Sequence, residues 1–374
     1  MIRGSDAEAI RAADAACADP SLTVSRWKLL SGKKAIGCAP IYVPEEVLHA
    51  AGILPVTVWG TPEPNGNTGQ IPSFLCPVAR GIFSAIRGSL GSQLDALVIP
   101  STCDTLQNAF EVLRLSGESR PLFSLVFPVS GNVPGATEYL LDRIEAFREW
   151  TETVGGGPVS GGALDRSIRV YEENRRWFGL LERRMVESPG YVTAKEYDRI
   201  ARSGLLLPKE THSVLLGAVL SRPAPAGGRP RGKLFLSGMA LPAGLMDAID
   251  KARGALVGND LAWGHRYYAG HGEEDGDPIL HLVRRHFRRD FCSTLHDDGG
   301  SRAVHLLERV VATGADRLLM VRVRRCEPEG GDLPEIERTA REQGIPFLCL
   351  DTDLSGREGD SLAVRIEAFL EMGD

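Results

Sequence analysis

The stretch LDALVIPSTCDTLQNAFEVLRL, residues 94–115, contains the pattern that decides the fold of this chain. Its apolar run at Ala96–Ile99 predicts a strand that is buried on both faces. Residues 105–115 have the periodicity of a helix, and Cys103 lies in the loop between the two segments. This order of strand, loop and helix predicts one unit of a mostly parallel sheet that is covered by helices.

The same alternation continues in both directions along the chain. The neighbouring expected elements are strands at 34–38, 53–59 and 122–127 and helices at 45–51 and 78–86. After residue 233 the pattern resumes with the strand-like segments LFLSG, GALVGND, RLLMVRV and PFLCLD, which are separated by helical segments. We therefore predict the α/β class, with two parallel-sheet domains.

The rest of the chain is expected to be helical. Residues 137–225 contain long polar and apolar helical patterns without a clear strand, and SRPAPAGGRPRGK at 221–233 has the Pro and Gly content of a linker. The predicted organisation is N-terminal helices at 1–33, a first α/β domain at 34–136, a helical insertion or lid at 137–225 and a second α/β domain at 226–374.

Composition and charge exclude several classes of protein. A formal net charge of -6 argues against a general nucleic-acid binder, because binding phosphates requires a basic face. No apolar run approaches the roughly 20 residues that span a bilayer, and the first residues lack the apolar segment of a signal peptide. We expect a cytoplasmic protein without a membrane partner, whose seven cysteines are free thiols, metal ligands or catalytic groups.

Three cysteines occupy loops between strands and helices. These are Cys76, Cys103 and Cys326. Parallel sheets collect ligands at the carboxyl ends of their strands, and a helix N-terminus favours a thiolate. Each cysteine taken alone is better explained as a small buried hydrophobic residue, and their spacing matches no zinc-ribbon or ferredoxin motif. The residues therefore predict a shared thiol site without identifying a metal.

Several ordered segments carry a family resemblance. They are GCAPIYVPEEVLHAAGILPV at 37–56, FLCPVARG at 74–81, LDALVIPSTCD at 94–104, NDLAWGHRYY at 259–268 and GADRLLMVRVRRCEPEGGDLPEI at 314–336. With these segments in this order, the chain resembles the 2-hydroxyacyl-CoA dehydratase and benzoyl-CoA reductase family. The PIYVP turn looks closer to the smaller, cluster-bearing subunit of the benzoyl-CoA reductases.

The resemblance implies a specific cofactor and specific partners. It implies two flavodoxin-like domains that hold a [4Fe-4S] cluster through Cys76, Cys103 and Cys326. It also implies a heterodimer with a homologous second subunit, and an ATP-hydrolysing activator protein that donates single low-potential electrons. The substrate would be an acyl-CoA or aroyl-CoA thioester, which undergoes either ketyl-radical dehydration or reduction of its aromatic ring.

Other residues have more than one interpretation. Cys38 ends a predicted strand and is either a fourth cluster ligand or part of a pocket wall, whereas Cys17, Cys292 and Cys349 are interpreted as packing residues. Tyr42, His49 and Arg266 are candidate catalytic residues. His49 has the alternative role of a hydrogen-bonded structural histidine, and Arg266 that of an ion-pair partner across the domain cleft.

Two further hypotheses about function remain. The chain is alternatively a non-catalytic electron-relay subunit, or a homodimeric reductase of a small molecule that carries two linked clusters. The arginines of HLVRRHFRRD at 281–290 contact the phosphates of CoA or form a solvated basic face. No GxxxxGKS loop is present, so nucleotide hydrolysis is expected in a partner protein.

Overall fold

A computed structural model describes residues 5–60, 71–72, 74–224, 230–270, 276–289, 291–295, 301–357 and 359–372. The strands are β1 Ala35–Cys38, β2 Leu54–Thr57, β3 Ala96–Ser101, β4 Leu122–Val126, β5 Gly232–Gly238, β6 Gly254–Leu261, β7 Arg317–Val323 and β8 Phe347–Thr352. The α-helices are α1 Asp6–Ala18, α2 Pro20–Ser31, α3 Glu45–Ala50, α4 Pro77–Arg87, α5 Asp104–Leu115, α6 Ala136–Gly155, α7 Gly161–Glu187, α8 Ala194–Ser203, α9 Lys209–Leu220, α10 Leu245–Lys251, α11 His265–Tyr268, α12 Pro278–Phe287, α13 Arg302–Ala312, α14 Glu327–Glu342 and α15 Gly359–Glu371. A 3₁₀ turn, Gly91–Gln93, precedes β3.

The strands form two parallel sheets with the same topology. The first sheet has the order β2-β1-β3-β4 and the second the order β6-β5-β7-β8. In each sheet the second strand in the chain pairs on one side of the first, and the third strand pairs on its other side. This is the flavodoxin-like order, in which ligands bind beyond the carboxyl ends of the strands at the point where the order reverses. The predicted α/β class with two parallel-sheet halves is confirmed.

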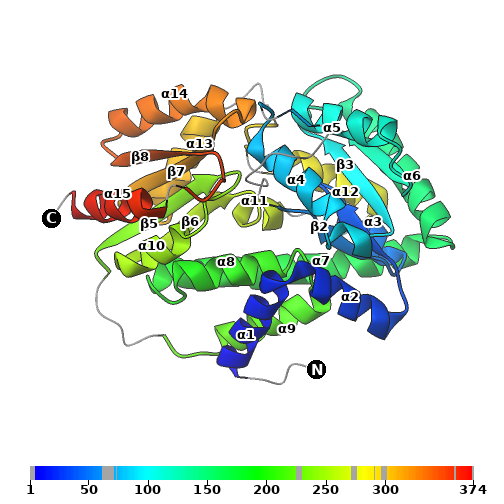
Figure 1. Cartoon of the computed structure of the whole chain (residues 1–374), viewed down its shortest axis with the longest axis horizontal. Coiled ribbons are helices and arrows are strands. Elements are labelled where there is room, and N and C mark those ends of the chain that lie inside the picture. Colours follow the sequence, from blue (N-terminus) through cyan, green and yellow to red (C-terminus); the bar gives the residue numbers. More distant parts are fainter. Residues whose placement is uncertain are drawn as a thin grey trace.

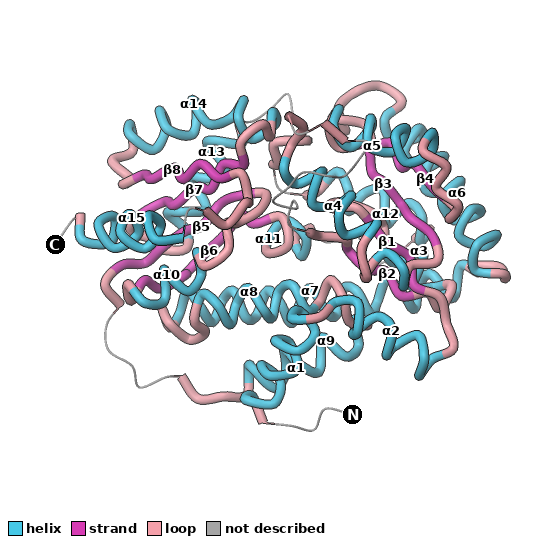
Figure 2. Tube along the Cα trace, viewed as in Figure 1, coloured by secondary structure: helices cyan, strands magenta, loops and turns pink. Residues whose placement is uncertain are grey.

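Burial of the central strands explains their apolar sequences. Val98 of β3 and Leu236 of β5 are fully buried, as expected where helices cover both faces of a parallel sheet. Figure 2 shows the strands gathered in two groups, with helices around each group. One continuous apolar core includes residues of both sheets, so the two halves are packed together.

Helices α6 to α9 follow the first sheet in the chain, and α7 and α8 lie beneath both sheets in Figure 1. The 27-residue helix α7 packs against α3 near the first sheet and against β6 near the second. The N-terminal helix α1 packs against α8 and α9. In the described part of the chain, no helix has both the length and the apolar character that crossing a membrane requires.

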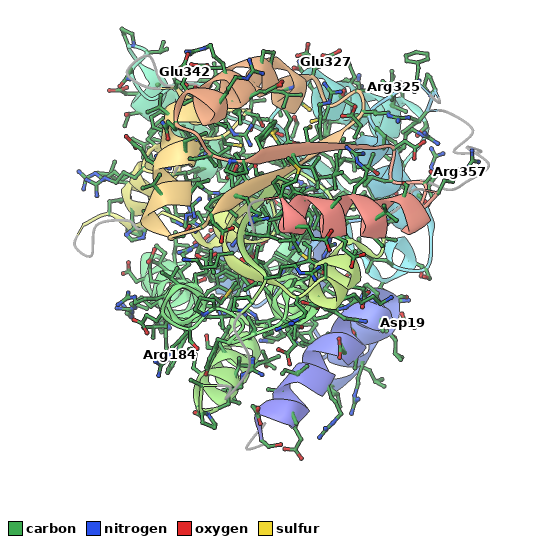
Figure 3. All side chains as sticks on the ribbon, turned by 90° about the vertical axis from the view of Figure 1, so that its left-hand side faces the viewer. Asp19, Arg184, Arg325, Glu327, Glu342 and Arg357 are labelled. Carbon is green, nitrogen blue, oxygen red and sulfur yellow. The ribbon has the colours of Figure 1, made fainter. Side chains whose placement is uncertain are left out.

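Helix α14 begins earlier than the sequence indicates. The sequence pattern favours a helix only over residues 335–343, whereas α14 starts at Glu327, directly after Cys326. Two glycines and two prolines in the first half of α14 lower its helix propensity, but proline at Pro328 is tolerated because the first turn has no intrahelical partner for its nitrogen. Figure 3 shows Arg325 and Glu327 together at this end of α14 and Glu342 at the other end.

Candidate functional site

Three of the seven cysteines line one pocket of about 560 Å³. Cys76 precedes α4, Cys103 lies between β3 and α5, and Cys326 lies between β7 and α14. The pocket also contains residues that follow β4, together with Ser293 and Thr294. The carboxyl ends of both sheets therefore contribute to one site, which is where this topology places ligands.

Each of these cysteines is the N-cap residue of a helix. Cys76 caps α4, Cys103 caps α5 and Cys326 caps α14. Unpaired backbone N–H groups and the helix dipole make such positions favourable for negative charge. The three thiols thus converge at three helix N-termini, in a pocket suited to thiolates.

The thiols of Cys76 and Cys326 form a hydrogen-bonded pair. The hydrogen bond from Cys326 lowers the pKa of Cys76 to about 7, helped by the N–H groups of Ala79 and Val78 and opposed by burial. The same hydrogen bond, together with burial, raises the pKa of Cys326. Burial also raises the pKa of Cys103. The two thiols therefore titrate as a pair. The pair loses one proton near neutral pH, and the two sulfur atoms share the proton that remains.

This pair predicts the reactivity of the metal-free chain. Alkylation of Cys76 by iodoacetamide should rise with pH around a midpoint near 7, below the ordinary cysteine value of about 8.5. Replacing Cys326 with alanine removes the hydrogen-bond donor, so the midpoint should move upward. Mass spectrometry of the alkylated peptide measures both profiles, and an unchanged midpoint in the variant would contradict the pairing.

The three thiols of the pocket are candidate donors for a metal group. Among the described residues, no three His, Cys, Asp or Glu side chains converge on one ion position. A mononuclear zinc site requires every sulfur to lie about 2.3 Å from the same ion. An iron–sulfur cluster instead binds each thiolate through a different iron, so its ligands lie farther apart. The donor set of three thiols around a 560 Å³ pocket fits a cluster of this kind.

Cys38 and Tyr42 lie around a second, smaller cavity. This cavity, which we call the chamber, has a volume of about 20 Å³ and is lined by Cys38, Tyr42, Glu45, Glu46, Thr57, Tyr171, Arg175, Lys209, Tyr267, Arg285 and Arg289 among others. Cys38 is buried at the end of β1, and it does not line the thiol pocket. Burial raises the pKa of its thiol.

Tyr42 and Cys292 connect the chamber to the thiol pocket. The Tyr42 hydroxyl donates a hydrogen bond to the Cys292 thiol, and residues 293 and 294 line the thiol pocket. Tyr42 has a φ of 84°, a left-handed conformation that is strained for a tyrosine. Burial opposes ionisation of Cys292, but Arg266 and Arg302 lower its pKa overall. Cys292 is buried in the apolar core, as its interpretation as a packing residue expects, and it has these polar neighbours in addition.

Arg266 belongs to a buried ion-pair network beneath the thiol pocket. Its Nε atom lies 2.8 Å from Asp260 Oδ1, and its Nη2 atom lies 3.1 Å from Glu329 Oε1. Arg302 Nη2 lies 3.0 Å from Asp260 Oδ2. Glu329 also accepts a hydrogen bond from the backbone N–H of Met239, which follows β5. The network therefore anchors the first turn of α14, and with it Cys326, to the second sheet.

His49 lies on a different face of the first half. Its Nδ1 atom is 2.8 Å from Ser167 Oγ, and its Nε2 atom is 3.1 Å from Glu210 Oε1. These contacts connect α3 to α7 and α9. His49 lines neither the thiol pocket nor the chamber.

Comparison with known proteins identifies the family. A sequence profile described as "2-hydroxyglutaryl-CoA dehydratase, D-component" matches residues 40–372. The chain belongs to this family. The match includes all three cysteines of the thiol pocket and every strand except β1, which ends at Cys38.

Relatives of this D-component family member come from two groups of enzymes. The (R)-phenyllactyl-CoA dehydratase beta subunit of Clostridium sporogenes is 25% identical over 94% of this chain and 95% of its own length. The beta subunit of lactoyl-CoA dehydratase from Anaerotignum propionicum is 26% identical, over 95% and 96%. A benzoyl-CoA reductase subunit of Thauera aromatica is 25% identical, over 92% of both proteins. The chain is thus of a dehydratase or oxidoreductase type, and these identities do not separate the two groups.

Three charged residues of the chamber are absent from the sequence predictions for this family member, whereas Arg285 and Arg289 belong to the basic run considered there. Glu46, Arg175 and Lys209 are buried charged residues that stand in ordinary helical segments. Arg285 and Arg289 belong to the basic run at 281–290, and both line the chamber. That run is the one signal that could have identified them, because arginines four positions apart share one face of a helix.

Proposed function

We propose that this chain is the [4Fe-4S]-bearing subunit of an enzyme that passes single electrons to a CoA thioester. The observation that supports this proposal most directly is the convergence of Cys76, Cys103 and Cys326 on one pocket. The related dehydratases and reductase, whose names refer to CoA thioesters, support the substrate class.

In this proposal the three thiolates hold the cluster, and the cluster supplies low-potential electrons. Cys76 and Cys103 come from the first half of the chain and Cys326 from the second, so the site requires both halves in their packed arrangement. The helix N-termini stabilise the negative charge of the thiolates and the cluster. Three thiolates leave one iron without a protein thiolate, and Cys38 forms part of the wall of the neighbouring chamber.

The rim of the thiol pocket suits a protein partner. Phe74 and Val129 have exposed fractions of 67% and 58%, and Val126 is also exposed. Val126 and Val129 line the pocket, and Phe74 lies two residues before Cys76. Exposed apolar side chains around a site mark surfaces for association. We propose that a homologous second subunit covers this rim and that an ATP-hydrolysing activator delivers the electrons, both in the cytoplasm.

Anaerobic reconstitution tests the proposal. The purified chain, incubated with iron, sulfide and thiol, should retain about four irons and the absorption of a [4Fe-4S] cluster. A reconstituted chain that retains no iron would refute the cluster. About eight irons per chain would instead support the homodimeric, double-cluster reductase.

The two branches of the family require separate assays. With its second subunit and activator, the loaded chain should either dehydrate a 2-hydroxyacyl-CoA or reduce the ring of benzoyl-CoA. The PIYVP turn at 40–44 favours the reductase branch. Activity of the complex together with substrate binding by the second subunit alone would assign this chain the role of an electron relay.

A further inference from the structure

The chamber has more positive than negative charge in its lining. Among the described residues, four basic side chains line it, those of Arg175, Lys209, Arg285 and Arg289, whereas the acidic ones are Glu45 and Glu46. Its volume of about 20 Å³ leaves room for one water-sized group. Buried charges are normally paired, because transferring an unpaired ion from water to the interior costs several kcal/mol.

Arg175 and Lys209 pair with the two carboxylates of the chamber, although the Oε2 atom of Glu46 is buried without a hydrogen-bond partner. Glu46 forms an ion pair with Arg175, which also lies 2.9 Å from Glu172. Glu45 lies 3.7 Å from Lys209 Nζ and accepts a hydrogen bond of 2.5 Å from the Tyr267 hydroxyl. These two basic groups therefore have their counter-charges within the protein.

Arg285 and Arg289 have no direct ion pair of this kind, and the nearby Glu46 offsets their charge only in part. Within the described ranges, neither forms an ion pair with a carboxylate. Arg285 is buried, and in the described part of the chain it donates only to the backbone carbonyl oxygens of residues 267, 269 and 270, at 3.3–3.4 Å. Arg289 lies over the Tyr42 ring at 4.5 Å, and its Nε atom is buried without a hydrogen-bond partner.

The electrostatic consequence is repulsion between two arginines four residues apart. Burial and the neighbouring guanidinium groups lower the pKa of Arg285, and burial lowers the pKa of Arg289 to about 10. A buried donor without a partner usually marks a bound water, ion or ligand. In this chamber, one small anion would satisfy the Nε–H of Arg289 and offset the excess charge.

We infer that the chamber is a binding site for one small monoanionic group, held by Arg285 and Arg289. This inference builds on the proposed function in one respect: the natural occupant is an oxygen atom of the CoA-thioester substrate that carries negative charge. Fixed cations in a water-poor cavity stabilise such an oxygen strongly, because they need no reorganisation when the charge develops. Tyr42 and Cys292 place this chamber beside the thiol pocket.

Bromide is the probe for this site, since it is a small monoanion with a strong anomalous signal. Crystals of the iron-free, full-length chain soaked in sodium bromide should show an anomalous peak between Arg285 and Arg289. In solution, bromide should raise the melting temperature of the chain, because a ligand that binds only the folded state stabilises it. A chamber without a bromide peak overturns the inference.

Arg289→Gln and Arg288→Gln form a matched pair of variants. Arg288 is exposed and does not line the chamber. Arg289→Gln should weaken bromide binding about tenfold or more, which corresponds to the loss of one charge-assisted hydrogen bond. It should fold at least as well as the wild type, because it removes an uncompensated charge from the chamber. Equal bromide affinity in the two variants would overturn the assignment of Arg289.

Competition distinguishes a substrate oxygen from a resident inorganic anion. Saturating benzoyl-CoA or 2-hydroxyacyl-CoA should displace the bromide from the chamber. If bromide stays bound beside the thioester, the substrate part of the inference is wrong. These experiments use the iron-free chain, whereas the proposed function depends on iron retention, so the two failures are distinguishable.

Discussion

Replacing Cys103 with alanine should abolish cluster retention while leaving the chain folded. Cys103 is a partly buried N-cap residue, whose side chain makes no capping hydrogen bond. Its removal therefore creates no large cavity in the apolar core, and we expect a stability loss of about 1 kcal/mol or less. The expected effect on cluster binding is much larger than the effect on stability, because the thiol pocket keeps only two of its three thiols.

The measurement is iron and sulfide content after anaerobic reconstitution, with circular dichroism to confirm folding. Cys349→Ala is the matched control, because Cys349 lies on β8 outside the thiol pocket. The control should retain about four irons and the Cys103 variant almost none. A Cys103→Ala chain that kept its full iron content would exclude Cys103 as a ligand.

The sequence alone predicts the sheets because their central strands are short apolar runs between turn signals. Residues 96–99 and 318–321 are buried almost completely, so their composition reflects both covered faces of a strand. The boundary of α14 is harder to predict. Its first turn is held by contacts of Glu329 with Arg266 and Met239, which are distant in sequence.

The candidate site is less predictable than the sheets, because much of it also depends on contacts between residues that are distant in sequence. A cysteine at the end of a strand and the start of a helix points to a ligand position, and Cys103 and Cys326 have this pattern in their own segments. Whether a charged residue such as Lys209 is buried depends on tertiary packing, which local periodicity does not encode. Cys292 is similar, because its polar surroundings come from Tyr42 and Arg266.

Replacing Asp260 with asparagine should cause the largest loss of stability among single polar substitutions near the site. Asp260 is buried and accepts hydrogen bonds from Arg266, Arg302 and Ser237 at 2.8–3.0 Å. The asparagine is similar in shape but has no charge, so the positive charges of the two arginines lose the carboxylate that offsets them. Removing one partner of a buried ion pair typically costs about 3–5 kcal/mol.

The pH dependence and a surface control sharpen this prediction. Burial alone would raise the pKa of Asp260, but Arg266 and Arg302 hold it well below its usual range. The ionised Asp260 therefore contributes fully to the free energy of unfolding above about pH 3.9, the pKa of an aspartate in the unfolded chain. This contribution is lost as the pH falls toward the lower pKa that Asp260 has in the folded chain. Urea denaturation should show a large deficit in the free energy of unfolding for Asp260→Asn at pH 7, and this deficit should shrink below pH 4.

Asp247→Asn is the surface control. It removes an exposed ion pair with Lys195 and should lower the free energy of unfolding by at most about 1 kcal/mol. Equal losses in the two variants would mean that the network beneath Cys326 does not hold α14 in place.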